Sequence, residues 1–213
     1  MSDEIIPQRI DYGDRELNLG QLESTPMPVF REWLKEAVGA GIEEANAACL
    51  CTVDAQGCPD GRTLLIKGVE DDGLLFYTNY RSRKGEQLSH CPRATLVIWW
   101  PSLRRQIRVS GGVEKLTASE SDSYFSTRPR ESRLGAWASL QSTPIDGREV
   151  LETRLAEYDH EFSDEIPRPE YWGGYRLRPK RFEFWQGRDS RLHDRFEYQK
   201  GEKEDWTISR LMP

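Results

Sequence analysis

Residues 48–78, ACLCTVDAQGCPDGRTLLIKGVEDDGLLFYT, contain three short β-type segments separated by turn signals. The segments are 48–54, 62–69 and 74–78, and the turns are 54–57 and 71–73. Turns rich in Asp and Gly between apolar or alternating runs are typical of β-hairpins. We therefore expect an antiparallel meander of three strands in this stretch.

The rest of the chain alternates between helical and β-type patterns around this stretch. Helical spacing occurs at 26–38, from Thr117 with Glu120 completing a capping box, at 131–140, and after Asp146 with Glu149 three residues on. Further β-type segments lie at 94–100, 105–115, 175–177, 181–185, 195–199 and 206–209. The order predicts a mainly β, α+β fold, a Greek-key-like antiparallel barrel with helices packed around it.

Length and charge limit the class of protein. The 213 residues suit one domain at 25–213, preceded by a polar segment, 1–24, that lacks periodicity and that we interpret as a mobile arm or lid. The net charge of -6 disfavours binding to nucleic acid and to anionic membranes. The acidic start does not resemble a signal peptide and no apolar run is long enough to span a bilayer, so we expect a soluble, cytoplasmic protein.

The chain carries none of the common catalytic or metal motifs. It has no G-x-S-x-G, H-E-x-x-H, Walker or G-x-G-x-x-G sequence, and the spacing of its four cysteines with His90 matches no common zinc site. We therefore expect reduced thiols, no metal, and a borrowed cofactor for any difficult chemistry.

Two groups of basic residues in the middle of the chain could bind phosphate. Ser82, Arg83 and Lys84 follow a strand and open a short helix, whose free N–H groups favour anions. Tyr124 and Arg128 lie four residues apart on one helix face, so both could contact one anion. The alternatives are a solvated Arg-Lys pair and an ordinary charged helix end.

Basic and polar residues also occur on strands. Arg62 and Lys67 have an odd offset and point to opposite faces of a regular strand, unless a bulge redirects one. Gln106 shares a polar strand face that could simply be solvated.

The segment 185–195 is the most unusual part of the chain. If it is extended, Arg191, His193 and Arg195 project to one side beside Trp185 and form a cationic comb that favours an anionic ligand. The alternative is a set of salt bridges to Asp189, Asp194 or Glu183.

In combination, these residues resemble the pyridoxine/pyridoxamine 5'-phosphate oxidase family, flavoproteins of vitamin B6 metabolism. The resemblance covers the chain from about Pro26 to Pro213. It rests on Gly61-Arg-Thr-Leu-Leu-Ile-Lys67, Phe76-Tyr-Thr-Asn79, Ser82-Arg-Lys84, Arg105-Gln106, Tyr124-Phe with Arg128-Pro-Arg130 and Ser132, Leu134-Gly-Ala-Trp137, Gln141-Ser142, Tyr171-Trp-Gly-Gly174, Glu183-Phe-Trp-Gln-Gly187, Arg191-Leu-His-Asp-Arg195 and Arg210-Leu-Met-Pro213.

The resemblance implies a split β-barrel and a homodimer that holds FMN between its subunits. It implies FMN contacts at Arg62, Thr63, Leu64, Leu65, Ile66, Lys67, Tyr77, Thr78, Arg83, Lys84, Gln106, Gln141, Ser142, Trp185 and Arg195. It implies substrate contacts at Lys67, Tyr124, Arg128, Ser132, Arg191, Leu192 and His193, with Arg9 and Tyr12 of the arm closing as a lid.

The implied reaction oxidises pyridoxamine or pyridoxine 5'-phosphate to pyridoxal 5'-phosphate. A hydride passes to flavin N5, O2 is reduced to H2O2, and Arg191 and His193 act as catalytic residues that orient the amine or alcohol and manage its proton. Two alternatives remain: a sister flavin oxidase that acts on another ring, such as a phenazine precursor, and a non-catalytic carrier of FMN or pyridoxal phosphate.

Overall fold

A computed structural model describes residue 13 and residues 15–213. The predicted lid residues Arg9 and Tyr12 lie outside the described residues. The described chain divides into two compact units, which we treat separately. The terminal unit holds the described residues up to Ala45 with Val97–Val109 and Arg181–Pro213, and the central unit holds Asn46–Leu96 and Ser110–Lys180.

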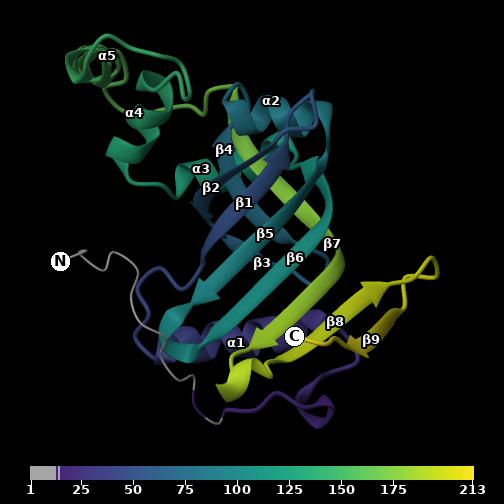
Figure 1. Cartoon of the computed structure of the whole chain (residues 1–213). Coiled ribbons are helices and arrows are strands. Elements are labelled where there is room, and N and C mark those ends of the chain that lie inside the picture. Colours follow the sequence, from purple (N-terminus) through teal and green to yellow (C-terminus); the bar gives the residue numbers. More distant parts are fainter. Residues whose placement is uncertain (1–12, 14) are drawn as a thin grey trace, which may run out of the picture. The chain divides into compact units, whose positions relative to one another are not determined.

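Both units contain strands; in the described chain α1 lies in the terminal unit, and α2 to α5 lie in the central unit (Figure 1). The strands are hydrogen-bonded in the order β2-β1-β5-β6-β7-β4-β3, with β8 on β7 and β9 on β8. The elements are α1 (Pro26–Gly39), β1 (Ala47–Val53), β2 (Pro59–Leu65), β3 (Gly68–Val69), β4 (Leu74–Asn79), α2 (Arg83–His90), β5 (Arg93–Trp100), β6 (Arg105–Lys115), α3 (Ala118–Ser126), α4 (Arg130–Ala138), α5 (Arg148–Glu161), β7 (Trp172–Gln186), β8 (Asp194–Lys200) and β9 (Trp206–Arg210).

The two antiparallel pairings of the predicted meander are confirmed, but its single middle strand is wrong. The expected strand 62–69 is two strands: β2 pairs antiparallel with β1, and β3 pairs antiparallel with β4. Neighbouring residues bond to different parts of the chain at the break, because Ile66 N donates to Asn46 O (2.9 Å) whereas Lys67 N donates to Leu75 O (2.8 Å). The chain therefore changes its strand neighbour between Ile66 and Lys67.

The predicted segments 175–177 and 181–185 form one strand, β7. The residues between them, Arg178, Pro179 and Lys180, interrupt the apolar pattern, but the strand continues through them. The first residues of β7 pair antiparallel with β4 in the central unit, and its last residues pair antiparallel with β8 in the terminal unit.

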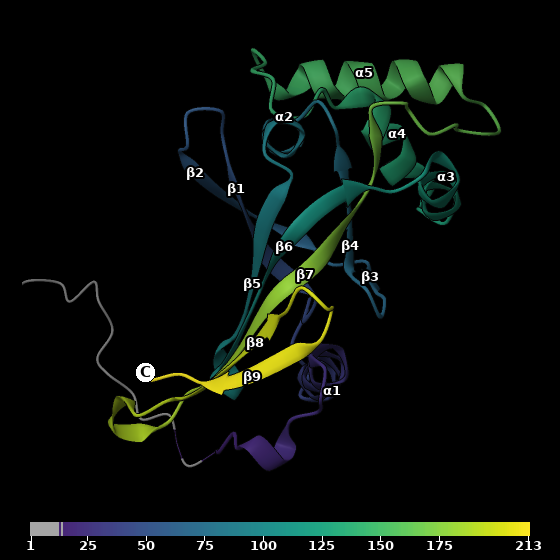
Figure 2. The same cartoon turned by 90° about the vertical axis from the view of Figure 1, so that its right-hand side faces the viewer.

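Aromatic side chains form the core of the terminal unit. Phe30 and Trp33 of α1 pack edge-on against Phe182 and Phe184 of β7, with ring centroids 6.1 and 5.2 Å apart. Tyr198 of β8 is buried and packs against Phe184 at 5.7 Å. Figure 2 shows β8 and β9 as the hairpin that closes the chain. The amphipathic helix predicted at 26–38 is confirmed as α1, with its apolar side buried.

The helices of the central unit begin close to the predicted positions. Thr117 caps α3 and forms the expected capping box with Glu120. Helix α5 begins at Arg148 after Gly147, so the prediction that Asp146 opens it is wrong. Helices α4 and α5 lie side by side in both views (Figure 1 and Figure 2), and Arg154 Nε of α5 donates to Ala138 O at the end of α4 (2.7 Å). None of the helices in the described chain is long and apolar enough to cross a membrane.

Candidate functional site

A cavity of about 390 Å³ in the central unit gathers the predicted phosphate-binding residues. Helix α3 presents Tyr124, the loop after it presents Arg128, and the first turn of α4 presents Ser132. Lys67 contributes from the link between β2 and β3. The lining residues are Leu65, Lys67, Tyr77, Tyr124, Thr127, Arg128, Pro129, Ser132 and Trp172.

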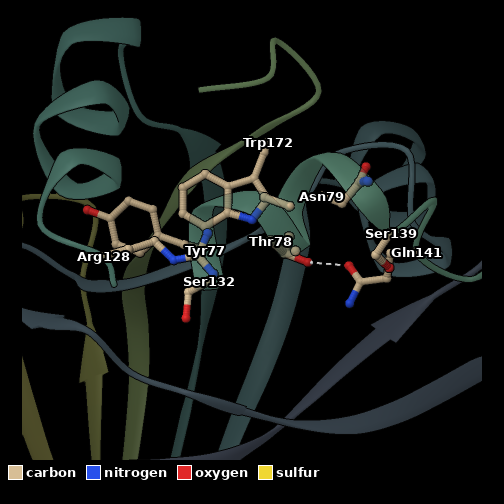
Figure 3. A pocket seen from close by; sticks show the side chains of 10 residues that line it. Tyr77, Thr78, Asn79, Arg128, Ser132, Ser139, Gln141 and Trp172 are labelled. Carbon is tan, nitrogen blue, oxygen red and sulfur yellow. Dashed lines mark hydrogen bonds between the residues drawn. The ribbon is translucent and has the colours of Figure 1, made fainter. Parts of the chain in front are cut away.

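Arg128 is the most constrained cation of this cavity. Its guanidinium carbon lies 4.5 Å from the centre of the Trp172 ring, within cation–π range (Figure 3). Its Nη1 atom is buried and has no hydrogen-bond partner among the described residues. Burial lowers the pKa of Arg128, and Tyr124 opposes this effect. A buried guanidinium nitrogen without a partner fits an anionic ligand, which would satisfy both its charge and its donors.

Stacked aromatic rings form the wall beside Arg128. The rings of Tyr77 and Tyr124 are 3.7 Å apart and nearly parallel, and Trp172 continues the stack 5.7 Å from Tyr77. Burial raises the pKa of Tyr77 to about 12, so its hydroxyl is neutral at physiological pH. Two glycines follow Trp172 because a Cβ on Gly173 would come 2.2 Å from the hydroxyl oxygen of Tyr80, and one on Gly174 would also clash.

A second cavity of about 360 Å³ shares Tyr77, Arg128, Ser132 and Trp172 with the first. Figure 3 shows its polar side, where Thr78 Oγ1 donates to Gln141 Oε1 (3.1 Å). The structure therefore brings predicted substrate-binding and cofactor-binding residues to the same part of the central unit. Its other lining residues are Thr78, Asn79, Gly135, Ala136, Ser139 and Gln141.

The start of α2 joins this polar side. Ser82 caps the helix by accepting from Gly85 N, and Lys84 Nζ donates to Ser82 Oγ and to Thr78 Oγ1 (both 3.3 Å). Arg83 N donates to Ser142 Oγ (3.2 Å). Burial, and then the neighbouring Arg62 guanidinium, lowers the pKa of Lys84. A cation destabilised by burial at a helix N-terminus suits a bound phosphate.

The side chains of residues 62–67, which are expected to contact FMN, differ in burial and in their partners. The Arg62 guanidinium bonds with Asp60 (2.6 Å) and Gln87 (3.1 Å). Thr63 and Lys67 are exposed, and Ile66 is buried; Leu64 and Leu65 are half-buried. Arg62 is thus committed to neighbouring side chains, whereas Lys67 reaches the cavity.

The remaining predicted residues, Gln106, Trp185, Arg191, Leu192, His193 and Arg195, belong to the terminal unit. The prediction of an extended cationic comb is wrong. Residues Asp189–Arg191 form a 3₁₀ turn in which Ser190 and Arg191 have φ values of 56° and 61°, and β8 begins only at Asp194. A turn does not project every second side chain to one side.

Salt bridges account for Arg195 in this segment, as the alternative interpretation expected. Its guanidinium donates to Glu183 Oε1 (3.0 Å) and to Met212 O (2.7 Å), and Arg108 pairs with the same Glu183 carboxylate at 3.1 Å. The carboxylate of Glu183 is buried, and the two guanidinium groups compensate its charge.

His193 has a defined orientation. Arg188 N donates to its Nδ1 (3.0 Å), and its ring lies 4.6 Å from the Trp185 ring. Burial and the neighbouring Arg191 lower the pKa of His193 against the opposing effect of Asp194. With Nδ1 as acceptor, the neutral ring carries its proton on Nε2.

Sequence reasoning assigned no role to Trp172 or Thr127, which also line the larger cavity. The Tyr171-Trp-Gly-Gly174 sequence was a usable signal for Trp172, because two adjacent glycines beside an aromatic residue indicate a close approach of another group. No comparable signal marks Thr127.

Comparison with known proteins identifies the family. Residues 34–161 match the family model described as "Pyridoxamine 5'-phosphate oxidase", and residues 172–213 match "Pyridoxine 5'-phosphate oxidase C-terminal dimerisation region". A pyridoxine/pyridoxamine 5'-phosphate oxidase from Ralstonia pickettii (strain 12J) is 51% identical over 205 residues, 96% of this chain and 97% of its own length. One from Cyanothece sp. (strain PCC 7425) is 49% identical over the whole of both chains.

Solved structures show the same fold. PhzG from Burkholderia lata 383, in complex with tetrahydrophenazine-1-carboxylic acid, is 31% identical, with a TM-score of 0.87 over 93% of this chain and 98% of that one. A pyridoxamine 5'-phosphate oxidase-related, FMN binding protein from Nostoc punctiforme PCC 73102 has a TM-score of 0.72 over 90% of this chain and all of that one, at 19% identity. These matches confirm the predicted split β-barrel. The chain belongs to the pyridoxine/pyridoxamine 5'-phosphate oxidase family of enzymes.

Proposed function

We propose that this chain is an FMN-dependent oxidase that converts pyridoxamine 5'-phosphate and pyridoxine 5'-phosphate to pyridoxal 5'-phosphate, with O2 reduced to H2O2. The observation that carries the proposal is the buried Arg128 Nη1, which lacks a partner among the described residues in a cavity shared with Lys67, Tyr124 and Ser132. The names of the relatives support the same reaction.

The substrate phosphate is assigned to this cavity. Arg128 offers a fixed fork of donors, Lys67 adds a second positive charge, and the hydroxyls of Tyr124 and Ser132 add neutral donors. Tyr124 stays protonated because burial raises its pKa. An unphosphorylated substrate has no anionic group to bind Arg128 and Lys67. This set of donors therefore favours a phosphorylated substrate.

The residues at the start of α2 fit the phosphate of FMN. Lys84 carries a positive charge that burial and Arg62 both destabilise, and an adjacent phosphate dianion would compensate it. Arg83 adds a second cation, and the hydroxyls of Thr78 and Ser142 lie within hydrogen-bond distance of these residues. The other residues assigned to FMN are Arg62, Thr63, Leu64, Leu65, Ile66, Lys67, Tyr77, Gln106, Gln141, Trp185 and Arg195.

The reaction removes a hydride from the exocyclic carbon of the substrate and a proton from its oxygen or nitrogen, and this hydride and proton together account for the two hydrogens of the H2O2 that is formed from O2. Bound FMN would supply the two-electron acceptor, at N5, and pass the electrons to O2. Lys67 and Arg128 fix the phosphate end of the substrate, so much of the rate comes from positioning. Arg191 and Leu192 are assigned to the substrate ring, and His193, with Nδ1 held by Arg188 N, donates a hydrogen bond from Nε2 to the exocyclic group. For the amine, hydrolysis then releases ammonia.

The active form is assigned as a homodimer. Residues 172–213, which match the dimerisation region, include Trp185, Arg191, His193 and Arg195. Large apolar side chains are exposed in the terminal unit, including Leu192 (71%) and Met212 (90%). Apolar exposure of this kind suits contact with a second copy.

A related flavin oxidase acting on a phenazine precursor is the second candidate. The match to PhzG bound to tetrahydrophenazine-1-carboxylic acid favours it, since that ligand also carries an acidic group on a ring system. The two cations of the cavity, Arg128 and Lys67, together with its hydroxyl groups, favour phosphate over a single carboxylate.

Turnover measurements decide between these functions. The purified protein is loaded with FMN and given pyridoxine 5'-phosphate, pyridoxamine 5'-phosphate, pyridoxine or tetrahydrophenazine-1-carboxylic acid in air. We expect aldehyde absorbance and peroxide with the two phosphorylated substrates and at least about 100-fold lower kcat/KM with pyridoxine. Oxidation of the phenazine-type compound alone would establish the second candidate, and FMN binding without oxidation of any substrate would indicate a carrier.

A further inference from the structure

Asp194 is a buried carboxylate in β8 that joins three separate parts of the terminal unit. It is 2% exposed. Its Oδ1 pairs with Arg210 of β9, and its Oδ2 accepts from Leu17 N (3.1 Å) and Arg188 Nη1 (3.3 Å). A buried carboxylate is stable only when such partners compensate it. The reaction proposed above assigns it no role.

Arg188 contacts His193 through its backbone and Asp194 through its side chain. Its backbone N donates to His193 Nδ1, and its side chain pairs with Asp194 and with Glu16 Oε1 (3.0 Å). Fixing the Arg188 side chain therefore fixes the main-chain donor that sets the orientation and tautomer of His193.

The turn between Arg188 and His193 requires such support. Ser190 and Arg191 both have positive φ angles, which are unfavourable for residues with a Cβ. These conformations persist only where the surrounding structure holds them. Asp194 and Arg188 hold the two ends of the turn.

The same turn and Asp194 contact three described residues of the predicted arm, 1–24. Gly13 N donates to Asp189 Oδ1 (3.0 Å), Glu16 pairs with Arg188, and Leu17 N donates to Asp194. Leu17 is 4% exposed, so its side chain adds an apolar contact to these bonds. Gly13 and Glu16 are thus held by residues of the turn, and Leu17 by the buried Asp194 carboxylate.

We propose that Asp194 is a positioning residue for the oxidation. Through Arg188 it holds His193 with Nδ1 accepting and Nε2 donating, and through Leu17 N it fastens residues 15–17 to the turn that carries Arg191 and His193. The role in turnover rests on the proposed function, whereas the effect on the turn and on residues 15–17 does not.

Two variants and a matched control test this role. Asp194→Asn keeps the shape of the side chain and removes its charge, and Arg188→Gln releases the turn while Asp194 keeps Arg210 and Leu17 N. The control is Arg181→Gln, which also removes an ion pair of β8, that of Arg181 in β7 with Glu197 (3.7 Å), and leaves the partners of Asp194 in place. Thermal unfolding checks the fold of each, and if Asp194→Asn fails to fold, Arg188→Gln carries the test.

The first two readouts need no substrate. The chain has three histidines, so 15N spectra of histidine-labelled protein resolve His193, assigned with His193→Asn. We expect the Nε2–H tautomer in the wild type and the control, and a mixture of tautomers in both test variants. Trypsin cleavage after the exposed Arg15 should be about tenfold faster in Asp194→Asn than in the wild type or the control.

The third readout is turnover of pyridoxine 5'-phosphate by the FMN-loaded enzyme. Both test variants should lose about 10- to 100-fold in kcat. Their KM should change less than kcat, because the residues assigned to the substrate phosphate, Lys67, Tyr124 and Arg128, lie in the central unit and not in the turn.

The outcomes separate this role from the proposed function. A wild-type tautomer and wild-type cleavage rate in folded Asp194→Asn and Arg188→Gln would overturn the positioning role, even if kcat fell. Wild-type kcat in both variants would overturn it as well. A wild-type enzyme without turnover would contradict the proposed function alone, and the tautomer and cleavage would still test Asp194.

Discussion

Arg128 is the residue whose environment most depends on an anionic ligand, because its Nη1 is buried without a partner among the described residues. We expect Arg128→Ala to raise KM for pyridoxine 5'-phosphate by about 10- to 150-fold, which corresponds to the loss of about 1.5–3 kcal/mol from a charged hydrogen bond. Arg128→Lys should recover only part of this loss, since lysine keeps the charge and loses the planar fork. Steady-state kinetics with both variants measure the effect.

Unphosphorylated pyridoxine is the matched control for Arg128. If Arg128 binds phosphate, kcat/KM for pyridoxine should be nearly the same in the wild type and in Arg128→Ala. An equal loss with both substrates would contradict phosphate binding and would indicate that Arg128 supports the cavity through its contact with Trp172.

Lys84 makes the affinity for FMN depend on pH. Its pKa lies below the usual 10.5 because of burial and the neighbouring Arg62, so it loses its charge at lower pH than an exposed lysine. As pH rises through this lowered pKa, the positive charge beside the FMN phosphate disappears and the Kd for FMN should rise. Quenching of flavin fluorescence between about pH 7 and 10 measures this.

Lys84→Arg provides the comparison, because arginine stays charged over the whole range. Its Kd for FMN should change less with pH than that of the wild type. Any ionisation of the flavin ring affects both proteins equally. Parallel pH curves would therefore exclude Lys84 as the source of the pH dependence.

At the scale of elements, the capping box of α3 links local stability to the site. Thr117 Oγ1 accepts from Glu120 N (3.2 Å), Glu120 Oε2 accepts from Thr117 N (2.8 Å), and the helix carries Tyr124. Thr117→Ala should lower the free energy of unfolding by about 1 kcal/mol. Urea titration measures the loss, and Ser126→Ala at the other end of α3 should change it by less than about 0.5 kcal/mol.

The same capping box predicts a pH dependence. Hydrogen bonds from Thr117, and then Arg176, lower the pKa of Glu120 below 4.5, so the charged form stabilises the fold at neutral pH. This stabilisation is lost as pH falls through the lowered pKa. The difference between the wild type and Thr117→Ala should therefore narrow below pH 4.5, and a constant difference would show that the Glu120 carboxylate is not involved.

Local patterns predicted those elements whose signals are local. The strand predicted at 105–115 has the bounds of β6, and α3 begins at its predicted cap. The predictions failed where residues distant in the sequence determine the local structure. Asn46 and Leu75 determine where β2 gives way to β3, and Arg188 and Asp194 hold the turn that replaces the predicted comb. Neither pair can be found from the spacing of apolar residues.

At the scale of the whole chain, single motifs identified less than their combination. Tyr124 with Arg128, or Ser82 with Lys84, fits an ordinary charged surface when taken alone. Their joint occurrence in the order of one family predicted the family, which the matches over 34–161 and 172–213 confirm. The cavity supports part of the predicted site, since Lys67, Tyr124, Arg128 and Ser132 line it together. Sequence spacing could not show this, because these side chains come from separate elements.

The proposed homodimer leads to a prediction about how tightly the protein retains FMN. The mass by light scattering should be about twice the 24.7 kDa of the chain. If each FMN contacts both subunits, the fraction of bound FMN and the fraction of dimer should fall together on dilution, because each stabilises the other. Fluorescence of released flavin and sedimentation at the same concentrations measure the two fractions. A 24.7 kDa species that keeps one FMN per chain would contradict a shared site, and a stable dimer that releases FMN on dilution would show that assembly and cofactor binding are independent.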